Sequence, residues 1–139
     1  MAARGDLRFG RSEDEWHRLT EAGHAFLVDR ARLGRPTSYT EFNTVLAQRT
    51  GLRPFDFDLD AERAAMGYLL GRIVELDRPA SGLMISALVN YLNENEPGEG
   101  FFAFAQELCL LRRGASKEQK NDFWASQVTE LHRFYSRSA

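Results

Sequence analysis

Apolar residues near the start of the chain recur at the spacing of one helix face. They are Trp16, Leu19, Gly23, Phe26 and Leu27. Ser12 and Glu15 lie just before Trp16. A serine and a glutamate three residues apart can satisfy two backbone N–H groups at a helix start. Gly34 and Pro36 follow it, and such residues often come just after a helix. The pattern therefore predicts a helix over about residues 13–33.

A shorter helical pattern lies between residues 39 and 50. Its apolar positions are Tyr39, Phe42, Val45 and Leu46. A second serine–glutamate pair, Ser38 with Glu41, stands at its start, and Gly51 follows its end. The sequence therefore predicts a second helix over residues 39–50. A short strand is expected just before it, near residues 35–37.

Residues 52–59 contain a proline and alternate aspartate with phenylalanine. This composition is typical of a loop, and we expect its aromatic rings to pack beneath the domain. Asp58 or Asp60 is then expected to cap a third helix. The apolar face predicted for that helix consists of Ala64, Ala65, Leu69, Ile73 and Leu76. Pro79 and Gly82 mark its end.

The hydrophobic pattern changes its period between residues 83 and 91. Leu83, Ile85, Ala87, Val89 and Tyr91 alternate with Met84, Ser86, Leu88 and Asn90. Neither set is strongly polar, so the pattern predicts a β-strand that is covered on both faces. A partner strand is expected elsewhere, because a lone strand cannot satisfy its backbone hydrogen bonds. Residues 93–100 have the composition of a turn, and Phe101 begins either a short strand or a helix that continues to Leu111.

A third capping pair, Ser116 with Gln119, predicts a C-terminal helix. The order of elements is then typical of a winged helix-turn-helix, and we expect a mainly α (α+β) fold with a small β element. The expected division of the chain is residues 1–139 as a single domain, 36–102 as its winged-helix-like core, and 12–33 and 103–136 as flanking helices. The alternative is an all-helical domain in which residues 83–91 form a lone connection.

Composition narrows the class of protein. The chain has 139 residues, of which 43% are hydrophobic, and this suits one domain with a sizeable core. It has no long uncharged apolar run, so we expect no membrane segment and a cytoplasmic location. The single cysteine, Cys109, excludes a disulfide framework within the chain, and we expect it to be buried as a small apolar residue. The net charge of −2 means that DNA binding would need a local basic patch.

Several short motifs between the second helix and Phe101 match one known pattern. Thr37-Ser38-Tyr39-Thr40-Glu41-Phe42-Asn43 is similar to Thr-Thr-Tyr-Gly-Glu-Ile-Ala, and Arg63-Ala-Ala-Met-Gly67 is similar to Arg-Ala-Val-Gly. Leu88-Val89 and Gly100-Phe101 match later Val-Val and Gly-Phe positions. With these motifs, residues 36–102 resemble the winged-helix DNA-binding domain of alkylguanine-DNA alkyltransferases and alkyltransferase-like proteins, which flip a damaged base out of the duplex.

The chain departs from this family at the catalytic motif. Where the family has Pro-Cys-His-Arg, this chain has Met84-Ile85-Ser86-Ala87. Alkyl transfer needs a thiolate that a nearby histidine activates. Because Ile85 cannot supply a thiolate, the resemblance implies DNA binding without alkyl transfer.

Four residues are candidates for DNA binding. The resemblance implies that Tyr39 contacts a backbone phosphate and that Arg63 lies at the start of the recognition helix. Arg72 would extend a basic strip from these two residues, and Arg35 belongs to a local basic cluster. The alternative is structural: Tyr39 packs at a helix start, and Arg63 pairs with Asp60 on its own helix.

The turn before Phe101 is a candidate for contact with a protein partner. Glu96 and Glu99 make it acidic, which disfavours phosphate, and its glycines specify a tight conformation beside two aromatic residues. We therefore expect Glu96, Glu99 and Phe101 to form a partner-binding surface. The alternative is a turn that anchors the wing to the core.

No metal or cofactor is expected. His17, Glu21 and His24 share one stripe of the first helix with the Glu-x-x-His spacing of di-iron bundles, but those sites need that motif twice. The aspartates at residues 56–60 alternate like the ligands of a calcium loop, but the glycine and the glutamate of that loop are missing. A solvated helix face and a capping loop account for these residues more simply.

The sequence thus favours a non-enzymatic winged-helix-like binding module, a DNA-associated accessory or regulatory protein with double-stranded DNA as its partner. The alternative is a protein interaction or assembly domain that does not bind nucleic acid. A hydrolase or nuclease is disfavoured, because no coherent set of acid, base and metal ligands is present in the sequence.

Overall fold

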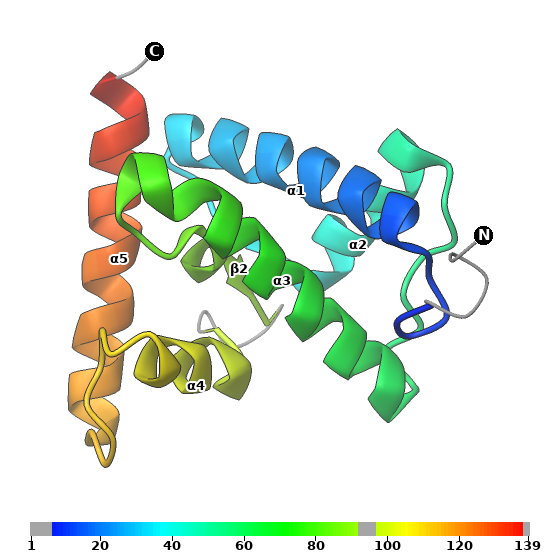
Figure 1. Ribbon diagram of the computed structural model, residues 1–139. Coiled ribbons are helices and arrows are strands. Elements are labelled where there is room, and N and C mark those ends of the chain that lie inside the picture. Colours follow the sequence, from blue (N-terminus) through cyan, green and yellow to red (C-terminus); the bar gives the residue numbers. More distant parts are fainter. Residues whose placement is uncertain (1–6, 92–96, 138–139) are drawn as a thin grey trace.

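The structure, a computed structural model, describes residues 7–91 and 97–137 of the chain and is mainly helical (Figure 1). Its α-helices are α1 (Glu13–Leu33), α2 (Tyr39–Thr50), α3 (Asp60–Ser81), α4 (Glu99–Glu107) and α5 (Lys117–Arg137). A 3-10 helix, η2 (Ile85–Leu88), and two short strands, β1 (Thr37–Ser38) and β2 (Val89–Asn90), complete the described elements. Helices α1 and α3 pack along each other, and α5 packs across α1 and η2 (Figure 1). The described helices include none that is long and apolar enough to cross a membrane.

The predicted helix starts at the three serines are confirmed. The Ser12 hydroxyl accepts from the backbone N–H of Glu15, whose side chain in turn accepts from the Ser12 N–H. The same reciprocal pair joins Ser116 and Gln119 at the start of α5. Ser38 caps α2 by accepting from the Glu41 N–H at 3.0 Å. The sequence therefore placed the starts of α1, α2 and α5 correctly because these caps are local.

The expected start of α3 is only partly correct. The helix begins at Asp60, but its N-cap residue is Leu59, and neither Asp58 nor Asp60 provides a side-chain cap. Of the predicted apolar face, Ala65, Leu69 and Ile73 are buried, whereas Ala64 and Leu76 are exposed. The buried face of α3 is therefore narrower than the sequence pattern predicted.

The strand predicted over residues 83–91 is mostly wrong. Residues Ile85–Leu88 form η2, and only Val89–Asn90 is a strand. The expectation of burial on both faces is confirmed, since every residue from 84 to 90 is buried. Full burial produces the same mixed pattern in a 3-10 turn as in a strand, so periodicity could not distinguish them.

The partner of β2 is the short strand before α2. Thr37 pairs with Val89 and Ser38 with Asn90 in a parallel register. The short strand predicted near residues 35–37 is thus present, but it lies at Thr37–Ser38. The second strand considered at Phe101 is a helix instead, because α4 already begins at Glu99. The predicted turn at residues 93–100 lies largely outside the described residues.

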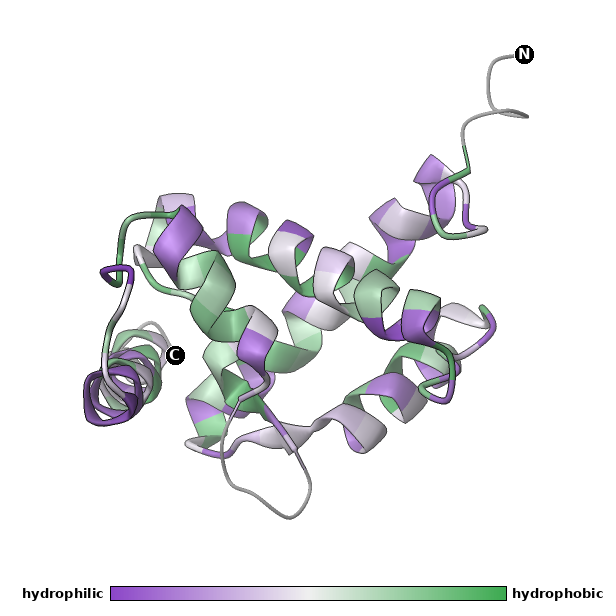
Figure 2. Ribbon diagram, turned by 90° about the horizontal axis from the view of Figure 1, so that it is seen from below, coloured by the Kyte–Doolittle hydropathy of each residue, from purple (hydrophilic) through white to green (hydrophobic). Residues whose placement is uncertain are grey.

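The helices enclose one hydrophobic core. Figure 2 shows the hydrophobic side of α5, seen end-on, turned toward the other helices. The centre of the core is formed by completely buried residues from α1, α2, α3 and η2, among them Leu27, Phe42, Leu69, Ile73 and Leu88. Gly23 lets these helices approach closely, because a Cβ atom at this position would lie 2.7 Å from Cδ1 of Ile73.

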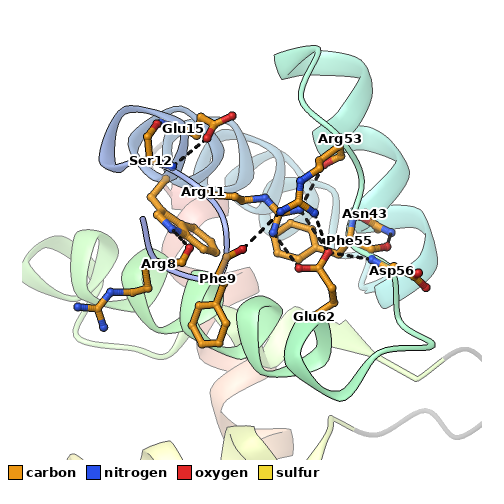
Figure 3. A network of polar contacts seen from close by, with 11 residues as sticks. Arg8, Phe9, Arg11, Ser12, Glu15, Asn43, Arg53, Phe55, Asp56 and Glu62 are labelled. Atoms are coloured by element: carbon orange, nitrogen blue, oxygen red, sulfur yellow. Dashed lines mark hydrogen bonds and ion pairs between the residues drawn. The ribbon is translucent and has the colours of Figure 1, made fainter. Parts of the chain in front are cut away.

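A buried ion pair fixes the segment before α1 (Figure 3). Arg11 is only 2% exposed, and its guanidinium lies 3.2 Å from the Glu62 carboxylate and 4.0 Å from the centre of the Phe55 ring. Arg53 pairs with the same carboxylate at 3.1 Å. The backbone N–H of Asp56 also donates to it at 3.1 Å. This network joins the N-terminal segment, the connection between α2 and α3, and α3 itself.

A second buried carboxylate, that of Asp77, joins three helices. His24 Nε2 lies 2.8 Å from Asp77 Oδ1, and the Ser81 hydroxyl donates to Oδ2 at 2.7 Å. The Tyr135 hydroxyl of α5 donates to the same carboxylate. Burial favours the neutral acid, but these hydrogen bonds outweigh it and hold the pKa of Asp77 below its usual value.

Candidate functional site

An open pocket of about 850 Å³ lies over the exposed face of α3, between the start of α2 and α4. Its wall is largely aromatic, with rings from Tyr39, Phe57, Tyr68, Tyr91, Phe101 and Phe104. Three of the four residues predicted to bind DNA line it: Tyr39, Arg63 and Arg72. Phe101, predicted to bind a protein partner, lines it as well. The fold therefore gathers residues from both sequence-based hypotheses at one place.

Tyr39 is the first residue of α2, and the Ser38 cap fixes its position. Its ring centre lies 5.2 Å from that of Tyr91 and 6.4 Å from that of Phe57. Burial, with a smaller contribution from Tyr91, raises the pKa of the Tyr39 hydroxyl to about 12. A neutral phenol is therefore present at physiological pH and can donate a hydrogen bond.

Gly98 lets the hydroxyl groups of two tyrosines converge. A Cβ atom at Gly98 would lie 3.1 Å from the hydroxyl oxygens of both Tyr39 and Tyr91. A side chain here would push the tyrosines apart or displace the start of α4. The glycine-containing turn singled out from the sequence thus shapes one end of the pocket.

Arg63 and Arg72 both form ion pairs with exposed carboxylates. Arg63 pairs with Asp60, as the structural alternative predicted, and also donates to the carbonyl oxygen of Phe57. Arg72 donates to both Glu13 oxygens, at 2.9 and 3.1 Å. The hydrogen bond from Arg72 and the charges around it hold the pKa of Glu13 below its usual value. Exposed pairs of this kind contribute little stability, so an incoming anion can replace the carboxylates.

The other predicted site residues lie elsewhere. Arg35 is exposed in the connection between α1 and β1 and does not line the pocket. Glu99 is exposed at the start of α4, beside pocket residues but not in the lining. Phe101 is only 6% exposed and packs against Phe102 and Phe123, so most of its ring belongs to the core. Glu96 lies outside the described residues.

Ser86 is a polar group in an otherwise apolar part of the pocket wall. It lies on η2, is 6% exposed and belongs to the pocket lining. Gly67 and Gly71 on α3 also line the pocket, and a Cβ atom at Gly67 would meet no atom within 4 Å. The site therefore combines aromatic faces, a hydroxyl group and two positions at which a ligand can approach the α3 backbone.

The charges in the lining are mixed. Arg63 and Arg72 are opposed by Glu75 and Glu107, whose exposed side chains also belong to the pocket. All four are surface groups on α3 and α4. Aromatic side chains therefore characterise this pocket more than its net charge does.

The histidines predicted on one stripe of α1 make separate contacts. His17 lies 3.3 Å from Glu21, whereas His24 binds Asp77. No group of three or more histidine, cysteine or acidic side chains within residues 7–91 and 97–137 is placed to hold a metal ion. The loop aspartates act locally, since Asp56 accepts from the backbone N–H of Asp58.

Cys109 is exposed, which corrects the expectation that it is buried. Helix α4 ends at Glu107, and Cys109 follows with a φ of 62°. This left-handed conformation breaks the helical stripe from which burial was predicted, so the side chain no longer faces the core. The sequence contains no glycine or proline at this point to signal the change.

Sequence reasoning missed Tyr68, Tyr91 and Phe104 as pocket residues. Tyr68 lies five residues after Arg63 on α3, on the exposed face of that helix, so an aromatic residue on a predicted recognition helix was a usable signal. The sequence pattern predicts a strand at Tyr91 and a flanking helix at Phe104, and neither prediction gives the position of the element relative to α3. Their meeting at one site depends on tertiary packing.

No protein-family model matches the chain, and no curated protein or solved structure matches it at a significant level.

Proposed function

We propose that this chain is a non-enzymatic, winged-helix-like binding module that associates with DNA, with α2 and α3 as its helix-turn-helix. The observation that carries the proposal is the convergence of Tyr39, Arg63 and Arg72 on one aromatic pocket. The sequence predicts a DNA-binding role for each of these residues. They come from two helices, α2 and α3, that the fold brings together.

The pocket suits a flat aromatic group. Bases taken out of a DNA stack bind between aromatic side chains, and each stacked base contributes about 1–3 kcal/mol to binding. The rings of Tyr39, Tyr91 and Phe57 provide such faces, and the Ser86 side chain supplies a hydroxyl group in the lining that can bond a polar edge. The resemblance to alkyltransferase-like proteins, which flip a base, agrees with this use of the pocket.

The arginines would contact the phosphates beside that base. Phosphate competes well for guanidinium groups, and the carboxylates that now hold Arg63 and Arg72 are exposed. Exchange of a surface ion pair for a phosphate contact releases counterions from DNA and is favourable at low salt. The binding energy would thus come from stacking in the pocket and from phosphate contacts at its rim.

The absence of enzymatic activity is part of the proposal. Ile85, at the position of the family's cysteine, is completely buried in η2. The described pocket lining contains neither a cysteine nor a histidine, so it offers no thiolate and histidine pair of the kind that alkyl transfer needs. We place this binding module in the cytoplasm.

Titration of duplex DNA tests the function. Labelled matched and mismatched duplexes should bind at low salt, and the affinity should fall as salt rises. A mismatched base is easier to unstack, so the mismatched duplex should bind more tightly. Arg63→Ala should weaken binding, whereas Arg133→Ala, which removes an exposed arginine from α5, should leave it nearly unchanged. Failure of the wild-type protein to bind either duplex at low salt would refute the proposal.

One observation favours a protein partner as a second candidate. The carboxylates of Glu75 and Glu107 lie in the pocket lining and would repel phosphate. The combined substitution Glu75→Gln and Glu107→Gln separates the two functions. It should strengthen binding to DNA if DNA is the ligand, and it should weaken binding to a partner that presents basic side chains.

A further inference from the structure

The segment before α1 brings another arginine to the edge of the pocket. The guanidinium carbon of Arg8 lies 5.1 Å from the centre of the Tyr68 ring, and that of Arg72 lies 5.9 Å from the same ring. Tyr68 lines the pocket described above. Two guanidinium groups from distant parts of the sequence thus share one aromatic ring at the rim of the site.

The side chain of Arg8 is available to a ligand. It is exposed, and no carboxylate among the described residues lies within ion-pair distance of it. Figure 3 shows it extending away from the polar network that holds the neighbouring residues. The charge of Arg8 acts on Glu13, which already accepts both hydrogen bonds from Arg72. The two positive charges of Arg8 and Arg72 and the one negative charge of Glu13 sum to a net charge of +1 beside Tyr68.

The backbone that carries Arg8 is held in place. Arg8 and Arg11 exchange two backbone hydrogen bonds of 2.9 and 3.0 Å, and the indole N–H of Trp16 donates to the Arg8 carbonyl oxygen at 3.0 Å. Phe9, inside this turn, has a φ of 54°, which is unusual for a residue other than glycine. The buried pair of Arg11 with Glu62 anchors the turn to α3. A fixed turn positions its arginine before a ligand arrives, so less entropy is lost on binding.

We propose that the Arg8–Arg11 turn is a second contact of the binding surface, in which Arg8 and Arg72 bind a backbone phosphate of the nucleic acid next to the pocket. This inference rests on the proposed DNA-binding function. It adds a contact from outside the helix-turn-helix. Planar guanidinium groups suit phosphate because they donate two parallel hydrogen bonds.

Two substitutions at this place should act in opposite directions. Arg8→Ala removes one phosphate contact, so the slope of log affinity against log salt should become shallower by about 0.9, and affinity at 0.1 M salt should fall by about five- to tenfold. Glu13→Gln releases Arg72 from its carboxylate and should raise the affinity. Arg8→Lys keeps the charge and should restore most of the slope.

The experiment is a fluorescence titration of the mismatched duplex from about 50 to about 200 mM salt with the full chain and these variants. Arg133→Ala is the matched control, since it also removes one exposed arginine but from α5, which Figure 1 shows on the other side of the molecule from the start of α1. A thermal melt of each variant shows whether the fold is kept. If the wild-type protein binds but Arg8→Ala changes the slope no more than Arg133→Ala, the contact at Arg8 is refuted and the pocket proposal stands. If the wild-type protein does not bind, both are refuted.

Discussion

The indole N–H of Trp124 donates a hydrogen bond of 2.8 Å to the backbone carbonyl oxygen of Ala87. Gln127, one turn further along α5, accepts from the backbone N–H of Met84 at 2.7 Å. The C-terminal helix therefore satisfies backbone groups of η2 that no strand ladder pairs. Because η2 carries Ser86, α5 also fixes one wall of the candidate site.

Loss of this indole donor should destabilise the protein. Trp124→Phe keeps an aromatic ring but leaves the buried Ala87 carbonyl without its partner, which should cost about 1–3 kcal/mol in the free energy of unfolding. Urea unfolding measures the change. Glu118→Gln, on the exposed first turn of α5, is the control and should have almost no effect. An unchanged midpoint in Trp124→Phe would show that this hydrogen bond contributes nothing.

The buried ion pair of Arg11 and Glu62 should show strong coupling. Glu62→Leu leaves the Arg11 charge buried without its main partner, and Arg11→Met leaves the carboxylate with only Arg53, so we expect each substitution to cost about 3–5 kcal/mol. The double variant removes both charges and should cost much less than the sum. Chemical unfolding of the four proteins gives the coupling energy directly. Additive losses would contradict a specific interaction between the two side chains.

Stability should fall in acid through Asp77. Its folded-state pKa lies below the value of about 3.9 expected for the unfolded chain, so the unfolded chain binds the proton more readily. The stabilising contribution is therefore complete above about pH 5 and is lost as the pH falls through the folded-state pKa.

Thermal melts between about pH 6 and pH 3 test this dependence. Asp77→Asn should lower the melting temperature at pH 6 and make the fall of the melting temperature below pH 5 less steep. Part of that fall should remain, because the pKa of Glu62 is also lowered in the folded state. Asp58→Asn changes an exposed aspartate and should leave the profile as in the wild-type protein. If the melting temperature falls as steeply with acid in Asp77→Asn as in the wild-type protein, Asp77 does not contribute to the pH dependence.

Two glycine-to-alanine substitutions should have opposite effects on stability. Gly23→Ala places a Cβ atom 2.7 Å from Ile73 and 3.0 Å from Phe42, and this overpacking should cost about 1–3 kcal/mol. Gly67→Ala meets open space on an exposed helix face and should stabilise the fold by about 0.5–1 kcal/mol, because alanine favours the helix. Differential scanning calorimetry measures both. Destabilisation by Gly67→Ala would mean that α3 is packed differently at the pocket.

The helices were predictable wherever their signals are local. The capping pairs at Ser12, Ser38 and Ser116 act within one turn, and the starts of α1, α2 and α5 follow from them. The start of α3 was less certain, because Leu59 provides no side-chain cap and the aspartates beside it bind other groups. A local signal thus predicts an element well only when the side chain has no better partner elsewhere.

The candidate site was predictable only in part. Tyr39 and Arg63 were found because a motif marks each of them, and Arg72 because it would extend a basic strip from these two residues. Tyr91 and Ser86 were not, because their places depend on a buried 3-10 turn whose hydrophobic pattern resembles that of a strand. Arg8 carried no signal, since its importance comes from its position beside Tyr68.

The sequence by itself determined the helical class, three helix starts and a set of candidate binding residues. These features depend on interactions within a few residues, which a linear pattern records. Only the tertiary structure decided that β1 pairs in parallel with β2, that Cys109 turns outward, and that aromatic residues from α2, α3 and α4 form one pocket. The physical reason is that long-range contacts depend on how helices fill space around Gly23 and the buried charges of Glu62 and Asp77, and no short stretch of sequence encodes that packing.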